Sequence, residues 1–168
     1  MSYPLLFFIK FKKEIQSIMD IDQLFSAANL LAMLGWALLI LVPRWKYTRI
    51  LVQGAVIPIL LSGLYLFLLV RHYGEMGEGG FGSLDELAIL FSNKNLIFLG
   101  WVHYLAFDLW LGTWEYNDAM RHGIHRLVLL PCQLLTFFAG PVGLFLYITI
   151  RNIKTQKFDH ENFDYSPR

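Results

Sequence analysis

Two proton-carrying side chains, His103 and Asp108, stand in an otherwise apolar and aromatic stretch of the chain. A charged aspartate at the centre of a membrane costs at least about 2.5–3.5 kcal/mol on insertion scales. Asp108 is therefore expected to face other helices, to pair with a partner, or to stay protonated. The chemistry that such residues offer is general acid–base catalysis. The alternative is structural, with both side chains forming hydrogen bonds between helices.

Helical geometry separates these two residues. With 100° per residue, four residues lie within about 40° of Asp108 on the helix surface: Trp101, Tyr104, Gly112 and Glu115. His103 lies about 140° away from Asp108 around the same helix. We call the face formed by Trp101, Tyr104, Asp108, Gly112 and Glu115 the polar stripe. His103 is not expected to bond Asp108 directly, so each is predicted to reach a neighbouring helix or a bound ligand.

The next apolar segment carries small and polar residues at a matching spacing. Six residues share a face within about 60° of Thr136: Cys132, Gln133, Thr136, Gly140, Gly143 and Tyr147. Small residues at this spacing let helices approach closely. Pro131 and Pro141 interrupt the backbone hydrogen bonds and can bend a helix so that a cavity opens. Ordinary close packing is the alternative explanation of the glycines.

Composition and segment length predict how these residues are positioned. The chain is 56% hydrophobic and only 16% charged, with a mean hydropathy of +0.48, which is more apolar than is usual for a soluble domain. A membrane-spanning helix needs about 20 apolar residues. Four segments meet this condition: residues 24–42, 50–70, 96–114 and 127–150. They show no alternation typical of strands, so we predict an all-α bundle of four transmembrane helices.

The segments outside these spans complete the predicted organisation. Residues 1–20 are expected to form an interfacial helix, residues 21–157 the transmembrane domain, and residues 158–168 a mobile tail. Ser83 and Glu86 form a capping box, which predicts a short amphipathic helix between the second and third spans. Four spans place both termini on one side, with nine Lys and Arg residues against five on the other. The positive-inside rule then predicts cytoplasmic termini.

The same composition excludes several functions. No basic face interleaved with aromatic residues is present, so nucleic acid is not an expected partner. The five histidines are scattered and too few for a membrane di-iron centre, and Cys132 is the single cysteine. We therefore predict no metal and no cofactor. Membrane lipid is the expected partner, and a homodimer is considered because four helices are few for a closed pocket.

A long motif carries a family resemblance. It runs from Gly100-Trp-x-His-Tyr to Trp114 and resumes from Pro131 to Leu144. The chain resembles the abscisic-acid-deficient-4-like family, whose plant members are associated with neoxanthin synthesis. The resemblance implies a small multi-pass protein of a bacterial inner membrane or a plastid-type membrane that acts on a carotenoid. In the plant members the reaction isomerises an epoxide to an allene.

The resemblance also assigns roles to residues of this chain. Protonation of the epoxide oxygen and removal of a vinylic proton need an acid and a base but no redox cofactor. His103 and Asp108 match the intramembrane histidine and aspartate of the family and are the implied catalytic pair. The implied pocket lining comprises Trp101, Tyr104, Gly112, Trp114, Thr136, Gly140, Pro141 and Gly143. A non-catalytic carotenoid- or lipid-binding scaffold and a small proton-coupled transporter remain as alternatives.

Overall fold

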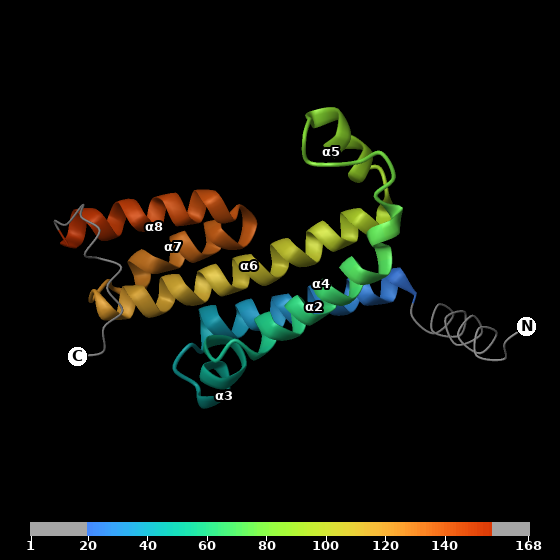
Figure 1. The fold of residues 1–168 in the computed structure, drawn as a ribbon. Helices are drawn as coiled ribbons and strands as arrows, with labels where there is room; N and C mark the ends of the chain where they lie inside the picture. The colour runs from blue at the N-terminus through green and yellow to red at the C-terminus, as the bar shows by residue number, and fades with distance from the viewer. Residues whose placement is uncertain (1–19, 156–168) are drawn as a thin grey trace, which may run out of the picture. The chain divides into compact units, whose positions relative to one another are not determined.

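The structure is a computed structural model, and it describes residues 20–155. This part of the chain is all-helical and contains no strand, as predicted (Figure 1). The longer helices are α2 (Ile21–Leu41), α4 (Val56–His72), α6 (Lys94–Arg121), α7 (Arg126–Phe138) and α8 (Gly140–Thr155). Short helical turns lie between them: α3 (Lys46–Thr48), the π-helix η1 (Arg49–Gln53), the 3-10 helix η2 (Tyr73–Glu75) and α5 (Leu84–Leu90). The predicted helix in residues 1–20 and the tail at 158–168 lie outside the described residues, apart from residue 20.

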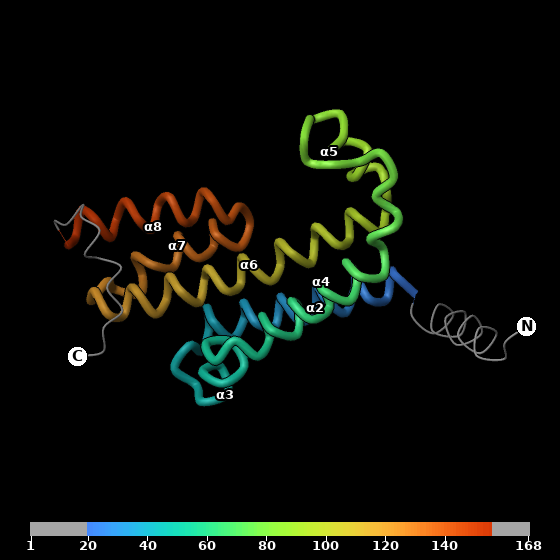
Figure 2. Tube along the Cα trace, in the orientation of Figure 1, coloured from blue at the N-terminus to red at the C-terminus, as the bar shows by residue number. Residues whose placement is uncertain are grey.

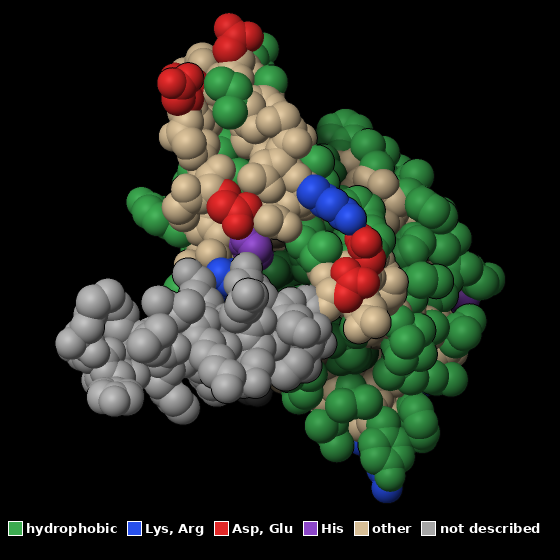
Figure 3. Space-filling view, turned by 90° about the vertical axis from the view of Figure 1, so that its right-hand side faces the viewer, with side chains coloured by type: hydrophobic (Ala, Val, Ile, Leu, Met, Phe, Trp, Pro, Cys, Tyr) green, Lys and Arg blue, Asp and Glu red, His purple; other side chains and the backbone are tan. Residues whose placement is uncertain are grey.

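Within residues 20–155, three helical segments are long and apolar enough to cross a membrane. They are Ile21–Leu41, Lys46–Glu75 and Lys94–Arg121. Large hydrophobic side chains such as Leu30, Leu66 and Val70 are more than half exposed on the protein, as expected where lipid is the solvent. Figure 3 shows hydrophobic side chains over a broad area of one face, with acidic side chains at the top, where Figure 1 places α5. The prediction of a multi-helix membrane protein is supported to this extent.

The predicted fourth span is not one helix. Residues 127–150 are divided into α7 and α8 at Ala139, whose backbone is not helical (φ −154°, ψ 78°). The two helices lie side by side, and the chain reverses between them (Figures 1 and 2). At 1.5 Å per residue they are about 20 and 24 Å long, shorter than the roughly 30 Å hydrocarbon layer. The count of four spans is therefore not confirmed, and the predicted side of the termini depends on that count.

The local sequence explains this reversal. Pro141 stands in the first turn of α8, where its missing N–H costs nothing and where it cannot extend α7. Gly143 then lies directly against α7, because a Cβ added to it would be 2.6 Å from Thr136 Cα. Only glycine permits this approach of two backbones. The small residues that predicted contact between separate helices thus hold two halves of one segment together.

The described residues divide into two compact units. The first contains Leu61–Leu105 and the described residues up to Met33, and the second contains Leu34–Leu60 and the described residues from Ala106 onward. In the first unit, α5 begins at Ser83, whose Oγ accepts from the Glu86 N–H at 3.2 Å. The short helix predicted from the capping box is therefore confirmed.

In the second unit, the segment between α2 and α4 is longer than the tight turn that hydropathy predicts. Thr48 Oγ1 donates to the Val42 carbonyl at 2.8 Å, and Gln53 Nε2 donates to the Pro43 carbonyl at 2.7 Å. The following Gly54 is required by space, because a Cβ there would lie 2.5 Å from the Ile50 carbonyl oxygen. These bonds fold residues 43–55 back on themselves and delay the start of α4 to Val56.

Candidate functional site

The carboxyl of Asp108 is buried in the second unit and lies against the start of α8. Asp108 is 9% exposed. A Cβ added to Gly140 would lie 2.5 Å from Asp108 Oδ1. The glycine backbone therefore covers the carboxyl at a distance that no other residue allows. Of the predicted pocket residues, Gly140 is brought directly to Asp108.

Glu115 is the second buried carboxyl of the polar stripe, and it faces α7. It is fully buried, and its Oε1 accepts from Thr136 Oγ1 at 2.7 Å. Its Oε2 is also buried and has no hydrogen-bond partner among residues 20–155. Thr136 in turn is covered by Gly143. Two carboxyls that are about 10.5 Å apart along the axis of α6 thus both point into the α7–α8 hairpin.

Gly112, between these two carboxyls, is required by packing. A Cβ on Gly112 would lie 2.7 Å from Trp36 Cζ3, so the indole from α2 occupies that space. The Gly112 carbonyl accepts from Gln133 Nε2 at 3.2 Å. Gln133 is buried. The polar stripe is thus closed on one side by Trp36 and on the other by α7.

A buried ion pair holds α8 to the end of α6. Arg151 is 2% exposed, and its Nε lies 2.8 Å from Asp118 Oδ2. Tyr147, which is fully buried, donates its hydroxyl to the same oxygen at 2.5 Å. The Trp114 ring packs edge-on against Tyr147, with the ring centroids 5.6 Å apart. The predicted pocket residue Trp114 therefore lies beside a charged network.

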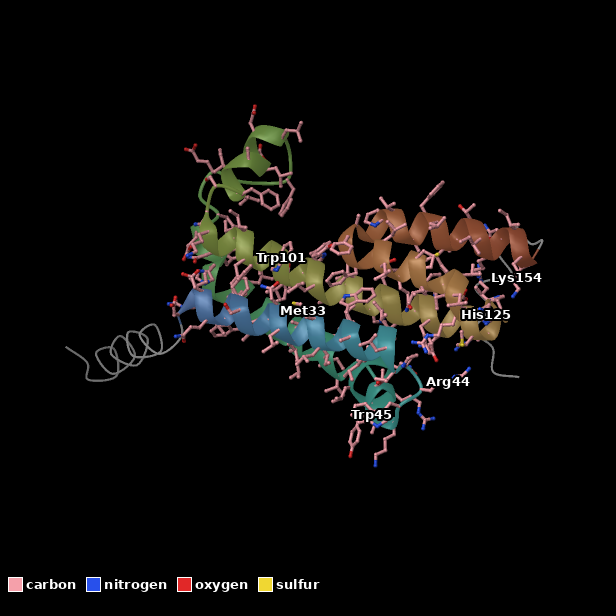
Figure 4. The ribbon with its side chains drawn as sticks, turned by 180° about the vertical axis from the view of Figure 1, so that it is seen from behind. Met33, Arg44, Trp45, Trp101, His125 and Lys154 are labelled. Atoms are coloured by element: carbon pink, nitrogen blue, oxygen red, sulfur yellow. The ribbon has the colours of Figure 1, made fainter. Side chains whose placement is uncertain are left out.

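The remaining predicted residues of α6 lie in the first unit. His103 is exposed, and its ring packs edge-on against Tyr65 with centroids 5.5 Å apart. Trp101 donates from Nε1 to Asn29 Oδ1 of α2 at 2.9 Å and stacks on Tyr104. Figure 4 shows Trp101 on α6. His103 and Asp108 therefore belong to different units, and their predicted joint role in catalysis stays a prediction.

The sequence reasoning missed several residues of this region. Pro141, predicted to line a pocket, is exposed. Arg151 was not among the predicted site residues, but it is buried with Asp118. Gln133 was expected only as part of the face around Thr136, and Trp36 was not among the predicted site residues. The signal that could have identified Arg151 is its position, four residues after Tyr147 and on the same face of a helix.

Among the described residues, no group of three or more His, Cys, Asp or Glu side chains is placed to hold a metal ion. Two carboxyls, one threonine hydroxyl and one amide lie buried between α6 and the hairpin, and these groups can hold, donate and accept protons or hydrogen bonds.

Comparison with known proteins gives one match. The family described as ABA DEFICIENT 4-like matches residues 23–147, which is most of the chain and includes every predicted site residue. No curated protein and no solved structure matches the chain.

Proposed function

Because the chain belongs to the ABA DEFICIENT 4-like family, we propose that it is a membrane enzyme that isomerises a carotenoid or a similar polyene by proton transfer. The resemblance noted from the motif is thus confirmed at the level of the family. The proposed substrate is apolar and dissolves in the bilayer. The proposed location is a bacterial inner membrane or a plastid-type membrane. Its proposed partners are membrane lipid and, in a homodimer, a second copy of the chain.

The observation that carries the proposal is the burial of Asp108 against the backbone of Gly140. Burying a carboxyl is costly, and its place in a small membrane protein needs a reason. Glu115 also supports a functional role for buried carboxyls, since one of its oxygens is buried without a hydrogen bond from residues 20–155. Proton-active groups held away from water are what acid–base catalysis on an apolar substrate requires.

The proposed chemistry is balanced without a co-reactant. An acid gives a proton to the oxygen of an epoxide as one carbon–oxygen bond breaks, and a base takes a proton from the adjacent vinylic carbon as the new double bond forms. Asp108 is proposed to serve one of these roles and His103 the other. Glu115 is proposed to act by positioning, because its hydrogen bond with Thr136 holds the hairpin whose Gly140 covers Asp108.

The test is expression in a host that makes epoxidised carotenoids, followed by extraction and chromatography of the pigments. Asp108→Asn is expected to abolish the new product, and Glu115→Gln to reduce it at least tenfold, while both variants remain in the membrane. Asp85→Asn is the matched control, because Asp85 is exposed in the first turn of α5. A product profile that is unchanged in Asp108→Asn and His103→Ala would show that these residues are not catalytic.

One observation favours a second function, a carotenoid- or lipid-binding scaffold without catalysis. Gly140 lies against the Asp108 carboxyl, and Thr136 donates a hydrogen bond to the Glu115 carboxyl, so packing alone explains the burial of both. In that case purified protein retains pigment, and pigment incubated with it in liposomes is recovered unconverted. Conversion by the purified protein would exclude the scaffold. A proton-coupled transporter using Asp108 would instead give proton flux in vesicles after a pH jump.

A further inference from the structure

A cavity of about 270 Å³ lies in the second unit, between the C-terminal half of α6 and the turn after η1. Its polar lining comes from Gln53, Asn117, Asp118 and Arg121, and its flat apolar lining comes from Trp110 and Trp114. Its volume equals that of about nine water molecules at roughly 30 Å³ each. Pockets for drug-sized ligands begin at roughly 300 Å³, so the cavity suits a single ring and not a whole lipid.

This cavity is separate from the buried carboxyls of Asp108 and Glu115. On a helix with 100° per residue, Asn117 lies about 180° and Trp110 about 160° from Asp108. The cavity therefore opens on the face of α6 that points away from the polar stripe. No step of the proposed isomerisation uses it.

The polar groups of the lining call for a ligand that both donates and accepts hydrogen bonds. The amides of Gln53 and Asn117 offer both functions, and Arg121 offers donors. Asp118 brings a carboxylate to the lining, and its Oδ2 accepts from Tyr147 and pairs with Arg151. A carboxylate oxygen accepts only, so it favours hydroxyl donors, and the opposite charges of Asp118 and Arg121 balance within the lining. A neutral, polyhydroxylated group satisfies this set of residues best.

The two tryptophans indicate the shape of that group and its place in the membrane. Trp110 is 52% exposed, although it lies on a helix that is apolar enough to span a membrane. Indole rings have a flat apolar body with one donor, and they concentrate at the membrane–water boundary. A ring whose edge carries hydroxyls and whose face carries C–H groups fits between such rings and the amides. We propose that this cavity binds the sugar ring of a glycolipid headgroup, with the acyl chains lying outside in the bilayer.

The test measures bound lipid on the purified full-length protein by native mass spectrometry. Monoglucosyl diacylglycerol, phosphatidylglycerol and phosphatidylcholine with the same acyl chains are supplied in equal amounts. The glucosyl lipid is expected to be enriched at least fivefold over phosphatidylcholine. Asn117→Leu and Trp110→Leu are expected to remove this enrichment. Trp45→Leu is the matched control, since Trp45 is 49% exposed and lies outside the cavity.

Each other outcome overturns the proposal. Equal retention of the three lipids would mean that the cavity does not select a headgroup. Preferred binding of phosphatidylglycerol that Arg121→Gln abolishes would mean an anion site instead. Enrichment of glucosyl lipid that survives Asn117→Leu and Trp110→Leu, in variants with wild-type helix content, would place the lipid elsewhere on the protein. None of these outcomes depends on whether the protein isomerises a polyene.

Discussion

Gly143→Ala is expected to open the α7–α8 hairpin. The added Cβ would lie 2.6 Å from Thr136 Cα, whereas ordinary contacts begin near 3.4 Å. The two backbones must therefore separate by nearly 1 Å, and overpacking of this kind costs about 1–3 kcal/mol. The shift also disturbs the hydrogen bond from Thr136 to Glu115, which adds about 1 kcal/mol. We expect the closed hairpin to lose about 2–4 kcal/mol of stability relative to its open state in total.

Cys132 makes this loss measurable without complete unfolding. It is the single cysteine of the chain, it is fully buried in α7, and its Sγ lies 3.6 Å from the Val128 carbonyl oxygen. A maleimide can react with it only when the hairpin opens, so the labelling rate follows the population of the open state. Because 1.4 kcal/mol is a tenfold change, we expect labelling of Gly143→Ala to be about 30- to 700-fold faster.

Gly63→Ala is the matched control for this experiment. Gly63 lies in α4, and a Cβ there meets nothing within 4 Å. Replacing glycine by alanine in an open helix position stabilises the helix by roughly 0.5–1 kcal/mol, so Cys132 labelling in this variant should match the wild-type rate. If Gly143→Ala also labels at the wild-type rate, the close approach of α7 and α8 is wrong, and so is our reason for the reversal at Ala139.

Three further changes test other contacts. Arg151→Met leaves the Asp118 carboxylate buried without the Arg151 ion pair, so we expect the free energy of unfolding to fall by about 3–5 kcal/mol. Adding Asp118→Asn should make this loss smaller. Equal melting temperatures of the single and double variants would contradict this expectation. Trp101→Phe removes the hydrogen bond to Asn29 and should cost about 0.5–1.5 kcal/mol in thermal unfolding in detergent. Ser83→Ala removes the cap of α5 and should cost about 1 kcal/mol, seen as faster amide exchange confined to α5.

The sequence predicted the parts of this fold that follow from local rules. Length and hydropathy are sufficient to identify α2 and α6, because a helix must be long and apolar to cross a membrane. The start of α5 was predicted because a capping box satisfies backbone groups within four residues. The polar stripe of α6 follows from the 3.6-residue period, and the structure buries its Asp108, Gly112 and Glu115.

The failures come from contacts between distant residues. Hydropathy cannot distinguish one helix over residues 127–150 from two short antiparallel helices, since both bury the same apolar side chains. The difference depends on whether Gly143 meets Thr136 or another part of the chain. Arg151 was not predicted for the same reason, because a charge near the end of an apolar run resembles a flanking residue until its partner is known. Cavities such as that beside Asn117 arise only from tertiary packing.

The reversal between α7 and α8 also bears on whether the chain crosses the membrane an odd or an even number of times. Lys154 near the end of α8 donates from Nζ to the Gly123 carbonyl, and Figure 4 shows it close to His125 before α7. The chain thus leaves the hairpin where it entered, so the hairpin adds an even number of crossings or none. If the three long apolar segments each cross once, the number of crossings is odd. The two ends of the described chain then face different compartments, and a label fused after residue 155 shares a compartment with the loop at 122–125.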